Sequence, residues 1–92
     1  MNMENRAIVS VVGKDQVGII AKVTAVLAEN QVNIMDISQT ILQDFFTMMM
    51  LIDLPEHESI HKLHEQFAPV EKEMGLKISI QLEDIFKAMH RV

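Results

Sequence analysis

The residue types best suited to chemistry lie where an apolar segment gives way to a helical pattern, in Gly13-Lys14-Asp15-Gln16-Val17-Gly18-Ile19. The free N–H groups of a helix start attract a carboxylate or phosphate, and Gly18 lets a ligand approach the backbone closely. Asp15 could meet an ammonium group beside them, so the segment would suit a zwitterion such as a free amino acid. The alternative is structural: Asp15 caps the helix itself, and Gly18 only eases packing. The segment is not a phosphate loop, because it lacks both the Gly-Lys-Ser/Thr ending and GxGxxG.

A second candidate is a set of three histidines, His57, His61 and His64, spaced i, i+4 and i+7 along one side of a predicted helix. Histidines at i and i+4 can hold zinc or nickel. These three flank an apolar stripe among charged residues, and a solvated helix face explains them without a metal. We favour the solvated face and predict neither a metal nor another cofactor.

The sequence contains no arrangement typical of catalysis. Its serines lie outside any nucleophile elbow, and no pair of carboxylates visibly converges with a histidine. Cysteine is absent, which excludes disulfides, zinc thiolates and thiol nucleophiles. We therefore expect a protein that is not an enzyme.

Length and charge restrict the remaining classes. The chain has 92 residues, which is one domain, and 49% of them are hydrophobic. Its net charge is −5 and its eight lysines and arginines are scattered, so direct nucleic-acid binding is not expected. The N-terminus has no apolar signal segment, and no apolar run approaches the length of a membrane span. These observations favour a cytoplasmic protein without membrane contact.

The hydrophobic periodicity predicts six regular elements and a helical tail. We expect, in order, strand 6–12, turn 13–16, a helix from Val17 to about Asn30, strand 32–42, turn 43–44, strand 45–54, a helix from residue 56 or 57 to Met74, strand 76–82 and a short helix over 85–91 capped by Asp84. One face of the first helix collects Ile20, Val23, Val26 and Leu27. Asn30-Gln31 suits the end of this helix, since asparagine tolerates the left-handed conformation. In the second helix, Pro69 predicts a kink or a break.

The order β-α-β-β-α-β, together with the right-handed crossover rule, favours one fold. We predict an α+β, ferredoxin-like βαββαβ sandwich with an antiparallel sheet in the order 4-1-3-2 and both helices on one face. The single domain spans residues 1–92, with a flexible N-terminus over 1–5 and the helical tail over 84–91.

The helix-free face of this sheet is expected to be apolar. On the third strand, Phe46, Met48, Met50 and Ile52 form one face and Phe45, Met49 and Leu51 form the other. An exposed face of this kind predicts a cover. A second copy of the chain is the simplest cover, since homodimers are the commonest soluble assemblies. Alternatively, the tail folds back over part of the face through Ile85, Phe86 and Met89.

The first-turn residues Gly-Lys-Asp-Gln-Val-Gly-Ile, followed by Gln-Val-Asn-Ile over 31–34, resemble the ACT domain family. The tail, Ile-Phe-Lys-Ala-Met-His over 85–90, is similar to that of short bacterial and archaeal single-ACT-domain proteins, which are related to glycine cleavage system repressors. The resemblance implies the fold above, self-association and regulatory binding of amino acids. The ligand-binding positions that it implies are Asp15, Gln16, Val17, Gly18, Ile19, Asn33 and Ile34. The family often has Arg/Lys-Pro where this chain has Gln16-Val17.

These positions cannot all meet within one chain. The first-turn loop follows the first strand, whereas Asn33 begins the parallel second strand, and a strand of about six residues spans roughly 20 Å. A site that uses both must combine Asp15 and Gly18 of one copy with Asn33 of an antiparallel second copy. We therefore predict a homo-oligomeric regulatory module that binds an amino acid at its interface and signals by ligand-linked assembly or by contact with a regulated protein. The alternative is a ligand-free interaction module.

Overall fold

The computed structural model describes residues 5–56 and 59–83. Its elements are β1 (Arg6–Lys14), α1 (Ile19–Glu29), β2 (Asn33–Leu42), β3 (Phe45–Asp53), α2 (Ser59–Met74) and β4 (Lys77–Leu82). The predicted flexible residues 1–4, His57 and the predicted tail helix with its apolar side chains lie outside the described residues.

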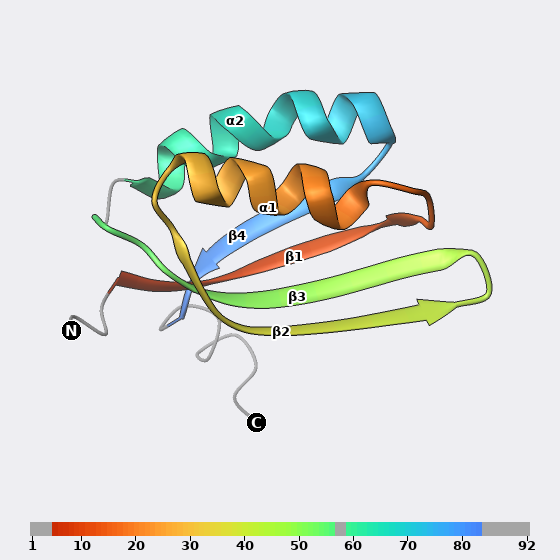
Figure 1. Ribbon diagram of the computed structural model, residues 1–92, viewed down its shortest axis with the longest axis horizontal. Coiled ribbons are helices and arrows are strands. Elements are labelled where there is room, and N and C mark those ends of the chain that lie inside the picture. The colour runs from red at the N-terminus through yellow and green to blue at the C-terminus, as the bar shows by residue number, and fades with distance from the viewer. Residues whose placement is uncertain (1–4, 57–58, 84–92) are drawn as a thin grey trace.

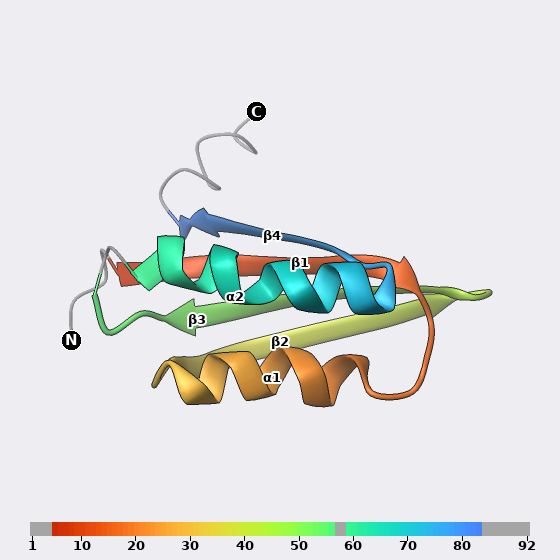
Figure 2. The same cartoon turned by 90° about the horizontal axis from the view of Figure 1, so that it is seen from above.

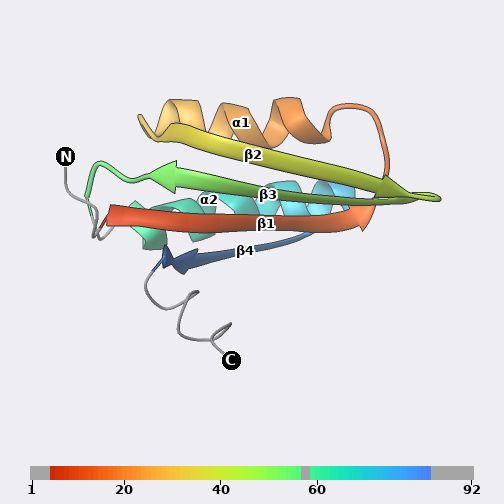
Figure 3. The same cartoon turned by 90° about the horizontal axis from the view of Figure 1, so that it is seen from below.

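The four strands form one antiparallel sheet in the order β2-β3-β1-β4, which confirms the predicted order read from the other edge. Both helices cover one face of this sheet, and the opposite face carries no helix of the described residues (Figures 1 and 2). Seen from below, the strands lie in front and the helices behind (Figure 3). The predicted ferredoxin-like α+β sandwich is therefore confirmed.

The core lies between the sheet and the two helices, and strict alternation on the central strands builds it. The residues of β1 and β3 that point to the helices are fully buried, and include Ala7, Val9, Val11, Phe46, Met48, Met50 and Ile52. From the other layer, α1 and α2 contribute Val23, Leu27, Leu63, Phe67 and Val70. Strand alternation has a period of two and helical burial a period near 3.6, as the sequence predicts.

The start of α1 differs from the prediction. The helix begins at Ile19, two residues later than expected, and its N-cap is Gly18 with φ of 95°. Asp15 is therefore not the cap, and that prediction is wrong; instead its backbone N–H donates to the Asp44 carbonyl at 2.7 Å. The predicted core residues Val23, Val26 and Leu27 are buried, but Ile19, four residues before Val23, takes the place predicted for Ile20, which is 40% exposed.

Two further helix predictions differ from the structure in part. α2 continues from Ser59 to Met74 with Pro69 inside it, so the break, one of the two outcomes predicted for Pro69, does not occur. The ring of Pro69 lies on the exposed side, where water can satisfy the Glu65 carbonyl that loses its partner. α1 ends at Glu29, which confirms the predicted helix stop at Asn30-Gln31, but the left-handed residue is Gln31, with φ of 59°, and not Asn30. The Asn30 amide donates instead to the Val26 carbonyl at 2.7 Å and to Gln66 Oε1 at 2.6 Å.

One irregularity in β2 decides which face its later residues occupy. The pairing with β3 shifts between Ile34 and Asp36, which makes Met35 an extra residue. Ile34 lies opposite buried Ile52 on the helix side, whereas Asp36 lies opposite Leu51 on the open side. If Met35 were a regular strand residue and not a bulge, alternation would place Asp36 on the helix side with Ile34.

An ion pair closes the far end of the sheet. The Arg6 guanidinium donates to both carboxylate oxygens of Glu83, through Nε at 3.0 Å and through a second, shorter contact. Both side chains are mostly buried, at 17% and 9% exposure. Hydrogen bonding to Glu83 raises the pKa of Arg6 above its ordinary value, so the guanidinium keeps its charge at any working pH. The pair fixes the point where the chain leaves β4.

Candidate functional site

Five of the seven predicted ligand-binding residues line one hollow at the start of α1. Asp15, Gln16, Val17, Gly18 and Ile19 surround a volume of about 440 Å³ together with the first turn of α1, Gln39, Ile41 and Phe46. Because Gly18 has no side chain, no side-chain cap covers the first N–H groups of α1, and no acidic residue lies in its first turn. The hollow thus combines uncapped N–H donors, an exposed carboxylate at Asp15 and apolar walls.

Gln16 holds one side of this loop. Its amide nitrogen donates to the Lys14 carbonyl at 3.1 Å and to the Met74 carbonyl, at the end of α2, at 2.8 Å. The side chain is therefore directed to backbone carbonyls and supplies no cation to the hollow. Val17 next to it is 99% exposed, so nothing in the isolated chain covers it.

The other two predicted residues line a second hollow, at the opposite end of α1. Asn33 and Ile34 border a volume of about 550 Å³ together with small side chains of the α1 flank, namely Ala21, Thr24, Ala25 and Ala28. Ala21 borders both hollows, so they follow each other along the same flank of α1, above β2.

The structure keeps the two groups apart, as predicted. Asn33 and Arg6 share the partner Asp53 on β3, whereas Leu42 and Lys14 share Phe45 at the other end. Asn33 is therefore level with the beginning of β1 and the Asp15 loop follows its end. Eight residues of strand, or about 26 Å, separate these levels.

β2 is a sheet edge that presents unusual apolar area. Nine of its ten residues are exposed, and Asp36 is its one charged residue. Exposed large side chains on this strand are Met35, Ile37, Ile41 and Leu42, with Ile37 at 45% and Ile41 at 54%. Edge strands normally carry charges or are short to prevent pairing with another chain. β2 is long and carries one charge, and its helix side holds exposed isoleucines, so it lacks most of the features that prevent pairing.

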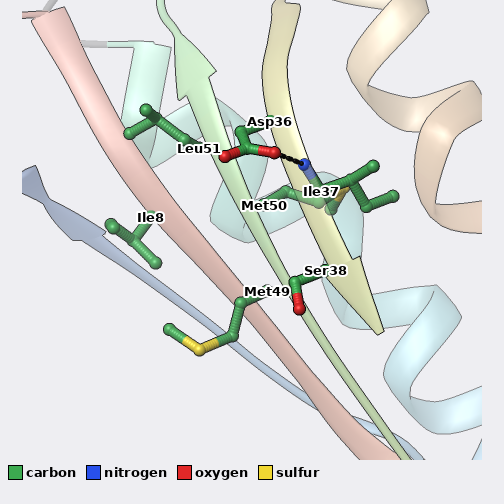
Figure 4. Close-up of a pocket in the computed structure, with 7 residues that line it drawn as sticks. All are labelled: Ile8, Asp36, Ile37, Ser38, Met49, Met50 and Leu51. Atoms are coloured by element: carbon green, nitrogen blue, oxygen red, sulfur yellow. Dashed lines mark hydrogen bonds between the residues drawn. The ribbon is translucent and has the colours of Figure 1, made fainter. Parts of the chain in front are cut away.

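A third hollow, of about 160 Å³, lies on the open sheet face (Figure 4). Ile8, Met49 and Leu51 form its apolar side, and Asp36 and Ser38 of β2 form its polar side. The Asp36 carboxylate accepts a hydrogen bond from the Ile37 N–H at 2.9 Å. The bulge at Met35 is what places this carboxylate on the open face.

The histidine candidates gain no support as a metal site. His61 and His64 are exposed on α2, and His57 lies outside the described residues. Across residues 5–56 and 59–83, no three His, Asp or Glu side chains group closely enough to hold a metal ion. Within the same ranges, no helix is long and apolar enough to cross a bilayer.

Comparison with known proteins gives the family. The ACT domain pattern matches residues 5–81. The chain belongs to the ACT domain family. A UPF0237 protein of Methanopyrus kandleri is 49% identical to this ACT protein over 88 residues, covering 95% of this chain and 98% of its own.

Solved ACT structures share the architecture. An ACT domain protein from Streptococcus pneumoniae superposes with a TM-score of 0.77 at 42% identity, covering 92% of this chain and 97% of its own. The regulatory subunit of aspartate kinase from Thermus thermophilus superposes with a TM-score of 0.69 at 25% identity, covering 85% of this chain and 51% of its own. The expected family membership is confirmed.

Several residues of the candidate site escape the sequence reasoning. The α1 flank of Ala21, Ala25 and Ala28 lines the hollows but carries no functional group that would attract attention. These alanines are three, four and seven residues apart, which places them on one side of the helix. This spacing was the signal in the sequence that could have indicated the flank. Ile41 lines the first hollow only because of the bulge, which the strand pattern does not reveal.

Proposed function

We propose that this ACT protein is a regulatory module that binds a free amino acid between two copies joined at their β2 edges. The observation that carries the proposal is the division of the predicted ligand-binding residues between two hollows on one flank of α1. A two-fold axis through the middle of β2 would bring the first hollow of one copy against the second hollow of the other.

The alternation of β2 restricts the pairing register, and the positions of the hollows favour one centre. Helix-side residues must face helix-side residues across an antiparallel pair, which holds for any pairing centred on a residue. We centre the pair on Ser38, which sets Ile37 opposite Gln39 of the second copy. Skipping the bulge residue Met35, it also sets Ile34 opposite Ile41 of the second copy, and those two residues border the second and the first hollow.

The helices favour the same arrangement. In this pairing the α1 helices of both copies lie side by side above the joined strands. Their facing flanks consist of small exposed residues, Ala21, Ala25 and Ala28 with Thr24, which allow two helices to approach closely. Ile20 and Val17 are exposed at the same end and would be covered.

The chemistry of the first hollow fits an amino acid. A carboxylate can accept hydrogen bonds from the uncapped N–H groups after Gly18 and is favoured there by the helix dipole. An ammonium group can pair with the carboxylate of Asp15. Ile20, Ile41 and Phe46 provide apolar contacts, which favour an aliphatic side chain on the ligand.

Regulation follows if the ligand binds the pair and not the single chain. Binding energy then shifts the population toward the assembled state, and a partner protein that distinguishes the two states receives the signal. The similarity to the regulatory subunit of aspartate kinase supports a regulatory role for the amino acid.

Mixed pairs test the shared site. Asp15→Ala and Asn33→Ala homodimers should each lose amino-acid binding, measured by calorimetry with leucine, valine and isoleucine. In a mixed pair, one site carries both substitutions and the other carries neither, so half of the sites should bind with wild-type affinity. D-leucine is the matched control ligand. Mixed pairs without any intact site would contradict the shared arrangement.

One observation favours a second candidate, a ligand-free interaction module. The position where the family often has a cation holds Gln16, whose amide donates to the Lys14 and Met74 carbonyls. A carboxylate ligand would lose that ionic partner. Pairing through β2 without any thermal stabilisation by amino acids would favour this candidate.

A further inference from the structure

We infer that the open face of the sheet is the docking surface for a second β2-joined pair, so that four copies close around two stacked eight-stranded sheets. The inference rests on the β2 pairing of the proposed function and concerns a surface that the ligand site does not use. It also predicts an order of assembly, with edge pairing first and face packing second.

The face is mostly apolar along its two central strands and polar at its borders. Residues that share this face by register on β1 and β3 include Ile8, Val12, Met49, Leu51 and Phe45, with Ser10 and Thr47 between them; Val12 and Met49 are 41% and 37% exposed. The flanking strands contribute Lys77 and Ser79 on β4 and Asp36, Ser38 and Thr40 on β2. An apolar centre with a polar rim is the composition of a protein interface.

The area of the open face indicates how many copies of the chain are needed to cover it stably. The four strands have nine, ten, nine and six residues, so at about 3.3 Å per residue and about 4.8 Å spacing one chain presents a flat area of about 540 Å². Two single chains packed face to face would bury about 1,100 Å², which is below the range of a standard stable interface. Two joined pairs would bury about 2,200 Å², which is above the lower limit of that range by a wide margin. The face therefore reaches the size of a stable interface only after the edges have paired.

Symmetry restricts the contacts. A closed assembly of four copies has mutually perpendicular two-fold axes that meet at one point. Because the edge axis passes through Ser38, the other two axes lie between the sheets at that level, and in an aligned packing of the sheets one of them runs across the strands. Register places Met49, Ser10 and Ser79 on the same level. Each of these residues would then lie against its own counterpart in the second sheet, with Met49 on the axis.

Residues on either side of that level would face one another. Ile8 is two residues from the axis in one direction and Val12 is two residues in the other, so these apolar side chains meet. On β2 the same rule sets the Asp36 carboxylate opposite the Thr40 hydroxyl, which can donate to it. The same rule sets Arg6 opposite Lys14 at the two ends of β1, where Arg6 is already paired with the Glu83 carboxylate. Sheets packed about 10 Å apart leave room for the side chains.

The test is the mass of the full chain and its variants in solution, measured by sedimentation velocity and native mass spectrometry. Wild type should have the mass of four chains and dissociate on dilution into two-chain species before single chains. Met49→Lys should stop at two chains, because two ammonium groups would meet at the axis. Ile37→Lys, on the edge but on the helix side, should give single chains. Ala68→Lys on the exposed side of α2 is the matched control and should keep four.

Each other outcome overturns the inference. In one of them, the wild type has the mass of two chains and Ile37→Lys the mass of one. That result would agree with the edge pairing and contradict the face packing. In that case, slow thiol labelling of Met49→Cys, in a chain with no other cysteine, would point to residues 84–92 as the cover. A Met49→Lys variant that still has the mass of four chains would also contradict the inference. So would the reverse order of effects, in which Met49→Lys gives single chains and Ile37→Lys gives assemblies of two chains. Val12→Lys repeats the test should Met49→Lys fail to fold.

Discussion

Gly18 turns the chain from the β1–α1 connection into the helix with φ of 95°, a conformation that side chains with a Cβ rarely adopt. Space is not the constraint, because a Cβ built at this position meets nothing within 4 Å. The absence of a side chain also leaves the first N–H groups of α1 uncapped, in the hollow beside Asp15. One residue therefore sets both the entry angle of the helix and the donors available to a ligand.

Replacing Gly18 should separate these two roles. Gly18→Ala should lower the free energy of unfolding by about 1–2 kcal/mol, the cost of the left-handed conformation for a residue with a Cβ. Gly18→Asn should lower it less, because asparagine tolerates this conformation, but its side chain can cap the helix and compete with a ligand carboxylate. Urea unfolding and amino-acid titration of both variants provide the measurements. Equal stability of wild type and Gly18→Ala would show that φ is not the constraint.

Single residues also show which details cannot be predicted from the local sequence. Asp15 has the chemistry of an N-cap, and a sequence pattern cannot tell that its backbone N–H binds the Asp44 carbonyl, 29 positions away. Ile19 and Ile20 are equally apolar, and the face that each occupies depends on the residue at which the helix begins. The three-dimensional turn decides these details, whereas the helix itself is predictable from its apolar spacing.

At the scale of elements, β2 depends on the extra residue Met35. The alternation of Ile34 to Leu42 would otherwise place Asp36 toward α1 and Ile37 toward the open face. The bulge keeps Ile34 packed against the core and still turns Ile37 and Ile41 to the helix side. Both the β2 pairing and the composition of the open face follow from this one insertion.

Deleting Met35 should therefore be tolerated. The shortened strand keeps Ile34 on the helix side and Asp36 on the open side, so the free energy of unfolding should fall by about 1 kcal/mol or less, within the range of an ordinary surface change. Ser38 lies in a regular part of the strand, and its deletion should lower the free energy of unfolding several times more. One half of β2 would then have its two faces exchanged, which either removes Ile34 from the core or moves Ile41 to the open side. Urea unfolding compares the two. A more harmful deletion at Met35 would contradict the role assigned to the bulge.

Elements were predictable where one periodicity covers many residues. The alternation of Phe46, Met48, Met50 and Ile52 and the helical spacing of Leu63, Phe67 and Val70 give the right strands, helices and sheet order. Pro69 misleads, because the cost of proline in a helix falls when its ring faces solvent. The bulge leaves no mark in the residue types of β2, since Met35 and Ile37 fit either face.

At the scale of the whole molecule, one chain does not bring the predicted site residues together. The loop after β1 and the start of β2 lie at opposite ends of parallel strands. The candidate site was predictable to the extent that the family motif marks its residues, and the proposed division between copies follows from topology. The alanine flank and the exposed edge of β2, which the proposal uses, are visible only in three dimensions.

A divided site makes ligand affinity depend on protein concentration. If only the joined pair binds, the apparent dissociation constant rises in inverse proportion to the paired fraction, so a solution that is about one-tenth paired should bind about tenfold more weakly. The amino acid should in turn drive pairing, seen as a shift of sedimentation toward larger species. Calorimetric titrations at several protein concentrations measure the first effect.

A tandem chain, with two copies joined by a flexible linker, is the matched control for this prediction. The linker raises the effective concentration of the second copy to the millimolar range, so the tandem protein should bind with one affinity at every dilution. Loss of pairing by Ile37→Lys should abolish binding in the separate chains and weaken it in the tandem chain. An affinity that stays constant while sedimentation shows the wild type separating into single chains would mean that one chain holds the complete site, and the shared hollow would then have no role.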